Sequence, residues 1–162
     1  MKILGILGFL VCLGFMYMTD LGICGIRKAV PAFRVLDMRF HYNSETVGQV
    51  LDQLGENGRL AYQRYLVLDF AFILFFFLTM LAISDSAMIS MNIKPILYIL
   101  CGLRALFDIL ENIMLIHMLR QYPSFNSTLA GICGWITTMK FLMLFIWLIG
   151  ILSQAVMAKL KA

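Results

Sequence analysis

Long apolar stretches, separated by short polar connections, dominate the pattern of this chain. Four such stretches run over about residues 3–26, 62–83, 95–118 and 129–157. A membrane-spanning helix needs roughly 20 mainly apolar residues, so each stretch has the length of one span. The pattern therefore predicts an all-α fold, an integral membrane four-helix bundle that forms a single membrane domain over residues 1–162.

The one substantial interruption, residues 29–61, carries the pattern of a short amphipathic helix. Asn43 or Ser44 can cap its start, apolar residues then recur at helical spacing up to Leu54, and Gly55 suits its end. We expect this helix to lie on the membrane surface or to cover the end of the bundle.

The third stretch differs from the others because it carries charges near its middle. Four polar residues fall on one side of the predicted helix at about 100° per residue: Arg104, Asp108, Glu111 and Asn112. An ionised side chain at mid-membrane costs roughly 2.5–3.5 kcal/mol, so the three charged residues would cost about 8–10 kcal/mol if they faced lipid. We therefore expect the rest of the protein to cover this polar stripe.

Two further charges lie inside predicted spans, Asp69 early in the second and Lys140 near the centre of the fourth. In antiparallel helices Asp108 and Lys140 lie at the same depth, which makes them the first predicted ion pair, while Asp69 and Glu111 both lie toward the large loop. In an alternative pairing Arg104 binds Asp108 one turn away, Lys140 binds Glu111, and Asp69 is hydrated at the interface. Either arrangement leaves one carboxylate without a cation, and that group must hold a proton or bind a cationic partner.

Composition supports the membrane prediction and excludes several other classes. The chain is 62% hydrophobic, against about 45–50% in soluble domains, and its mean hydropathy is +0.90. The net charge of +4 is spread over loops and helix ends, so nucleic-acid binding is not expected. Motifs of zinc proteases, serine hydrolases and phosphate loops are absent, and two distant histidines predict neither a metal site nor a cofactor. The four cysteines form no C-x-x-C pair, and most of them are expected to be buried thiols.

The sequence leaves the membrane orientation open. Basic residues favour a cytoplasmic large loop, because seven lie on its side and four on the other. The start of the chain, with only Met-Lys before the apolar run, favours a cytoplasmic N-terminus and an exported loop. The seven are Arg27, Lys28, Arg34, Arg39, Arg59, Arg64 and Arg120, and the four are Lys2, Lys94, Lys159 and Lys161.

Several short motifs lie between Val35 and Trp147. They are Asp37-x-Arg39 with Tyr42, Leu51-Asp-Gln-Leu-Gly55-x-x-Gly58-Arg59-x-x-Tyr62, Leu68-Asp69-Phe70, Asp108-x-x-Glu111-Asn112, Tyr122-Pro123 and Lys140. Together they resemble a group of small prokaryotic membrane proteins with four predicted spans and no known activity, although that group has glycines where this chain has Phe40-His41. The resemblance implies a multi-pass protein of the prokaryotic cytoplasmic membrane. It also implies one site that joins the Gly58-Arg59 turn to the charged residues of the spans.

These observations predict a non-enzymatic membrane protein, either an accessory subunit of a larger complex or a binder of a lipid or other apolar ligand. Its partners would be the bilayer and such a ligand, and a homo-oligomer is compatible with the pattern. The alternative is a membrane-embedded enzyme that uses Asp108 or Glu111 for acid/base chemistry on a lipid-like substrate. Proton- or ion-coupled transport is a third alternative, for which four helices make a small pathway. The predicted binding residues are Asp69, Arg104, Asp108, Glu111, Asn112, Lys140, Arg59 and Tyr62.

Overall fold

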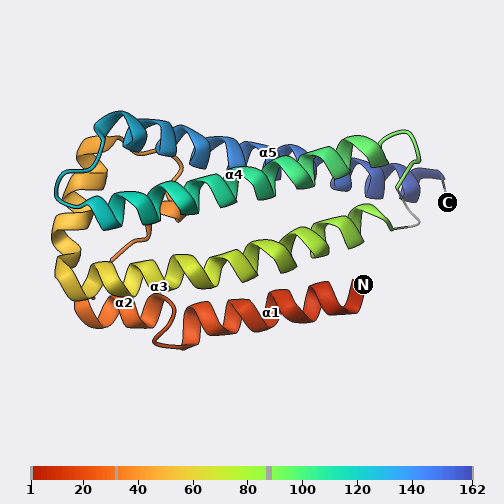
Figure 1. Cartoon of the computed structure of the whole chain (residues 1–162). Helices are drawn as coiled ribbons and strands as arrows, with labels where there is room; N and C mark the ends of the chain where they lie inside the picture. Colours follow the sequence, from red (N-terminus) through yellow and green to blue (C-terminus); the bar gives the residue numbers. More distant parts are fainter. Residues whose placement is uncertain (1, 32, 87–88, 162) are drawn as a thin grey trace.

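The computed structural model describes residues 2–31, 33–86 and 89–161, and its secondary structure over these residues is all helical (Figure 1). The elements are α1 (Lys2–Met18), α2 (Ile23–Ala29), the 3-10 helix η1 (Leu36–Met38), α3 (Ser44–Ser84), α4 (Lys94–Gln121) and α5 (Ser127–Lys161). The long helices run up and down, so that both termini lie at one end of the bundle (Figure 1). The predicted all-α fold is confirmed.

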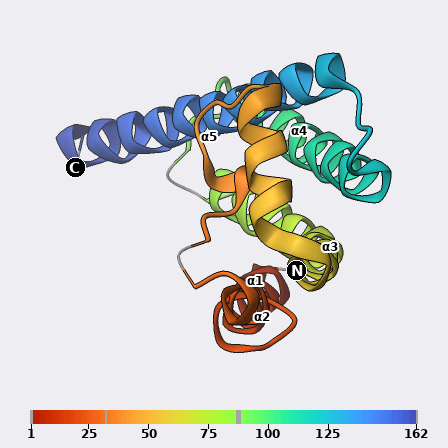
Figure 2. The same ribbon diagram turned by 90° about the vertical axis from the view of Figure 1, so that its left-hand side faces the viewer.

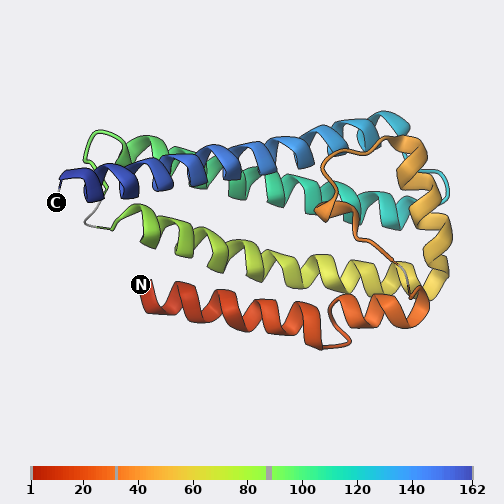
Figure 3. The same ribbon diagram turned by 180° about the vertical axis from the view of Figure 1, so that it is seen from behind.

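The long helix α3 occupies the centre of the bundle. It packs against α1 and α2 on one side and against α4 on the other, while α5 packs mainly on α4. In Figure 2, α1 and α2 lie on the far side of α3 from α4 and α5. The loop that follows α2 bridges this separation, because it runs from α2 up to α5 before α3 begins (Figures 2 and 3).

The first part of α3 is the predicted amphipathic helix. The Asn43 side chain caps it, since its Oδ1 accepts a hydrogen bond from the Thr46 amide at 2.9 Å. The helix then breaks at Gly55, whose φ of 59° and ψ of −174° are accessible almost only to glycine. Before this break the helix lies across the end of the bundle, and after it α3 runs along the bundle axis (Figure 3). The cap and the stop at Gly55 are therefore confirmed, whereas Gly58 and Arg59, expected to form a turn, are helical.

The first predicted span, residues 3–26, is not one continuous helix. α1 ends at Met18, and a turn leads into α2. The Thr19 hydroxyl donates to the Phe15 carbonyl at 2.6 Å, and the chain then folds so tightly that a Cβ at Gly22 would lie 2.0 Å from the Met16 carbonyl oxygen. The helix breaks here because a polar side chain competes for the backbone and a glycine permits the close approach.

Within the described part of the chain, three helical segments are long and apolar enough to cross a membrane: Lys2–Ala29, which includes the turn between α1 and α2, Ser44–Ser84 and Ser127–Leu160. Only 17%, 22% and 11% of their most apolar stretches are buried inside the protein, so most residues of these stretches are at least partly exposed. α4 has sufficient length but differs from these segments because it carries charges in its middle.

Candidate functional site

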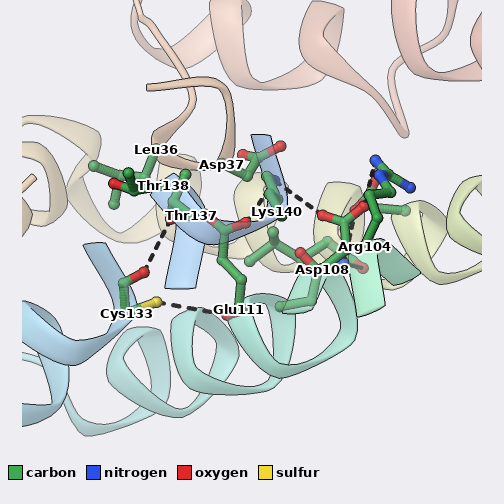
Figure 4. Close-up of polar contacts among 12 residues, drawn as sticks. Leu36, Asp37, Arg104, Asp108, Glu111, Cys133, Thr137, Thr138 and Lys140 are labelled. Carbon is green, nitrogen blue, oxygen red and sulfur yellow. Dashed lines mark hydrogen bonds and ion pairs between the residues drawn. The ribbon is translucent and has the colours of Figure 1, made fainter. Parts of the chain in front are cut away.

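Seven polar side chains from η1, α3, α4 and α5 form one buried group, which we call the charge cluster. None of them is more than 6% exposed. Figure 4 shows five of them converging from different elements. The members are Asp37, Asp69, Arg104, Asp108, Glu111, Asn112 and Lys140.

The ion pairs of the charge cluster centre on Asp108. Its Oδ2 lies 2.6 Å from Nη2 of Arg104, one turn away on α4, and its Oδ1 lies 2.9 Å from Nζ of Lys140 on α5. Lys140 also forms an ion pair with Glu111 (Figure 4). The predicted Asp108–Lys140 pair is thus confirmed, and the two pairs of the alternative arrangement exist beside it, because one ammonium group lies between two carboxylates spaced one turn apart on α4.

Asp69 is the carboxylate of the predicted spans that has no ion pair among the described residues. It is 3% exposed, so the hydration at the interface that the alternative arrangement gave it is wrong. Its Oδ2 accepts a hydrogen bond of 2.7 Å from Nδ2 of Asn112. Among the described residues no cationic group lies within 4.0 Å of it. A neutral amide therefore holds this acid in place, and its charge is not balanced by a direct ion pair.

Asp37 is a further buried acid that sequence reasoning did not place in the site. η1 brings it onto the bundle, where the hydroxyls of Tyr62 and Tyr65 donate to its two carboxylate oxygens at 3.0 Å each. The Tyr62 hydroxyl also accepts a hydrogen bond from the Leu36 amide at 3.0 Å. Burial raises the pKa of the Asp37 carboxyl above its usual value, against the opposing effects of Lys140 and the two tyrosines. Tyr62, a predicted binding residue, thus belongs to the site because it fixes Asp37.

Glu111 lies deeper than the other acids and is enclosed by polar side chains. The Thr137 hydroxyl donates to its Oε1 (Figure 4). The Tyr42 hydroxyl lies 3.3 Å from the same oxygen and 3.1 Å from Sγ of Cys133. Burial, and then the nearby negative charge of Glu111, raise the pKa of Tyr42. Glu111 is 0% exposed, so its side chain contacts only other parts of the protein in this structure.

Arg59, also predicted as a binding residue, does not join the charge cluster. Its guanidinium lies over the Tyr122 ring, 4.2 Å from the ring centroid, and its Nη1 donates to the Leu51 carbonyl at 3.0 Å. The Tyr122 hydroxyl in turn donates to Asp52 at 2.7 Å. Arg59 therefore ties the two parts of α3 to the α4–α5 connection, at the loop end of the bundle.

A cavity of about 240 Å³, which we call the inner cavity, adjoins the charge cluster. Five members of the charge cluster and Tyr65 line it, together with mainly apolar side chains. Among these lining residues, Nη1 of Arg104 is buried without a hydrogen-bond partner among the described residues. The polar lining residues are Asp37, Asp69, Arg104, Asp108, Lys140 and Tyr65, and the others are Leu13, Met16, Tyr17, Met38, Phe72 and Phe141.

This arrangement can hold a small polar group by charge-assisted hydrogen bonds in a cavity that apolar side chains also line. Asp108 and Glu111 are committed to ion pairs, whereas Asp69 lines the inner cavity without one. Over the described residues, no three His, Cys, Asp or Glu side chains are grouped so that they could hold a metal ion. Comparison with known proteins found no matching family model, no matching curated protein and no matching solved structure.

Proposed function

We propose that this chain is a multi-pass integral membrane protein whose inner cavity binds the polar part of an amphipathic, lipid-like molecule. The observation that carries the proposal is the composition of that cavity, whose lining combines buried charges with apolar side chains. An amphipathic ligand matches such a lining, because its polar group can satisfy buried donors and acceptors while its apolar part contacts the apolar side chains.

The surface of α4 supports four membrane crossings. The charged residues in its middle, Arg104, Asp108 and Glu111, are buried, while the exposed large side chains between residues 96 and 113 are apolar or aromatic, as at Ile99 and Ile113. A soluble helix has the reverse pattern. With 28 residues, α4 is about 42 Å long, enough for a hydrocarbon core of about 30 Å. We therefore infer that α4 crosses the membrane between α3 and α5, and the resemblance described above suggests the prokaryotic cytoplasmic membrane.

The volume of the inner cavity limits what it can hold. Pockets for drug-sized ligands measure about 300–1,000 Å³, and the inner cavity measures about 240 Å³. It suits a headgroup or another small polar moiety, and the rest of the ligand would lie outside it. This favours a binder over an accessory subunit, because a subunit that acts only through its outer surface has no need of such a cavity.

One observation favours an enzyme as the second candidate. Asp69 lines the inner cavity, is 3% exposed, and has no cation within 4.0 Å among the described residues. An acid in this setting can exchange a proton with a bound molecule. The candidate acid/base would then be Asp69, since Asp108 and Glu111, the residues first considered, are held in ion pairs. An Asp69→Asn variant that binds the same molecule as the wild type but leaves it chemically unchanged would support this candidate.

A cavity-filling variant tests the proposed function without altering any charge. Leu13→Trp places an indole ring into the inner cavity from α1. The control is Leu10→Trp, because Leu10 lies on the same helix and is 56% exposed. Native mass spectrometry of protein purified in mild detergent would show a co-purified amphiphile on the wild type and on Leu10→Trp, and its loss from Leu13→Trp. The same bound species on all three proteins, or on none, would contradict the proposal.

A further inference from the structure

A second hollow lies next to the inner cavity, and we call it the arginine hollow. It measures about 650 Å³. Arg27 lines it from α2, Arg34 and Arg39 line it from the two sides of η1, and His41 follows in the loop. Among the described residues that line the arginine hollow there is no aspartate or glutamate. It therefore gathers cationic side chains from two separate segments without acids to balance them.

Among the described residues, the three arginines have few hydrogen-bond partners. No carboxylate of the described residues lies within 4.0 Å of any of them. The Arg39 guanidinium donates to the Arg34 carbonyl at 3.4 Å, a long hydrogen bond that uses one of its five N–H groups. By contrast Lys28, which follows Arg27 in the sequence, is paired with Asp20. Three like charges around one hollow repel one another, and an anion bound between them would remove that repulsion.

The surroundings of the arginine hollow indicate which anion it takes. Guanidinium groups bind phosphate through two parallel hydrogen bonds, which makes arginine well suited to phosphate recognition. Apolar residues share the lining, and two of them, Met38 and Phe40, are 58% and 59% exposed. Arginines beside exposed apolar side chains match a molecule that carries a phosphate and a hydrocarbon chain. We propose that the arginine hollow binds the phosphate group of an anionic lipid-like molecule.

This second site adjoins the inner cavity but is separate from it. Tyr17 and Met38 line both the inner cavity and the arginine hollow, whereas Arg27, Arg34 and Arg39 line only the arginine hollow. The binding of phosphate by the arginine hollow does not require a ligand in the inner cavity. Ligand binding in the inner cavity and phosphate binding in the arginine hollow can therefore be tested separately, since Leu13→Trp fills only the inner cavity.

The experiment compares phosphatidylglycerol with phosphatidylcholine as probes, titrated onto the full chain in detergent and followed by native mass spectrometry. The test variant is Arg34→Gln with Arg39→Gln. The matched control is Arg64→Gln with Arg120→Gln, which removes two exposed cations from the same end of the bundle outside the arginine hollow. Each arginine near a membrane surface contributes about fivefold in affinity for an anionic lipid, so the test variant should bind phosphatidylglycerol about 25-fold more weakly. The control and Leu13→Trp should retain the wild-type affinity.

Inorganic phosphate distinguishes a lipid headgroup from a free ion. If free phosphate is the natural ligand, inorganic phosphate raises the Tm of the wild type but not that of the test variant, and phosphatidylglycerol is not preferred over phosphatidylcholine. A test variant that binds phosphatidylglycerol as tightly as the wild type overturns the proposal. So does a wild type that neither prefers phosphatidylglycerol nor responds to phosphate. Arg27→Gln, an exposed position on α2, provides an independent variant with an expected loss of about fivefold.

Discussion

Replacing Lys140 by methionine tests the energetic role of the charge cluster. Lys140 is 5% exposed and lies between Asp108 and Glu111, which are 2% and 0% exposed. Methionine fills a similar volume, so the variant removes the charge with little change in packing. Asp108 keeps its pair with Arg104, whereas Glu111 loses the one cation that lies within 4.0 Å of it among the described residues. Breaking a buried pair in this way costs about 3–5 kcal/mol, because it leaves an uncompensated charge in the interior.

The cysteines of the chain provide the assay. Cys12, Cys101 and Cys133 are buried free thiols, so a dye that fluoresces on reacting with thiols reports thermal unfolding. A loss of 3–5 kcal/mol lowers the Tm of a chain of this length by about 6–20 °C. The control Arg64→Met removes an exposed cation and should keep the wild-type Tm. An unchanged Tm for Lys140→Met would refute the reasoning.

A double-mutant cycle then tests whether the loss of stability in Lys140→Met comes from the Glu111 carboxylate, which that variant leaves without a cation. Glu111→Gln in the Lys140→Met background removes the uncompensated charge but keeps the shape and the Thr137 contact. The double variant should be more stable than Lys140→Met alone, with a coupling energy of about 1–3 kcal/mol between the two positions. Additive losses would mean that the two side chains do not act as a pair.

Three further predictions concern the loop end of the bundle and can be measured with the same unfolding assay. Burial raises the pKa of Asp37 in the folded state, so the stability of the wild type should fall as the pH rises from about 4, the usual pKa of aspartate, to the raised pKa. Asp37→Asn should remove this decline. Equal pH profiles of stability for the wild type and Asp37→Asn would contradict the prediction. Gly55→Ala should cost about 1–3 kcal/mol through its backbone conformation alone, since no atom lies within 4 Å of the added Cβ. Gly14→Ala, with the same free space inside α1, should instead stabilise the protein by about 0.5–1 kcal/mol. Asn43→Ala should cost about 1 kcal/mol by removing the cap of α3, and Asn43→Ser should restore most of it.

The parts of the fold that obey local rules could be predicted from the sequence. The cap at Asn43 and the stop at Gly55 depend on residues within one or two turns, and both are present. The Asp108–Lys140 pair could also be predicted, because antiparallel neighbours bring residues of equal depth together. The same reasoning treated pairing of Lys140 with Asp108 and with Glu111 as alternatives. In the structure Lys140, which has three N–H donors, binds both acids.

The loop contribution to the site could not be predicted in the same way. Asp37 lies in a segment without helical periodicity, and its place in the charge cluster depends on two tyrosines that follow it by 25 and 28 residues. Its only signal in the sequence was its position in a motif with Arg39 and Tyr42. The break after Met18 was missed for a related reason, since overall apolarity identifies a span but does not report a local turn.

Photochemical crosslinking in the native membrane tests the central claim, that the inner cavity holds a lipid-like molecule, most directly. A benzophenone amino acid at Phe72 faces the inner cavity, and the same group at Leu74, which is 54% exposed on the same helix, faces outward. After irradiation the mass of each adduct is read from the labelled peptide. The account predicts one discrete amphiphile at Phe72 and a mixture of bulk lipids at Leu74. The same mixture at both positions, or the absence of any adduct at Phe72, would contradict it.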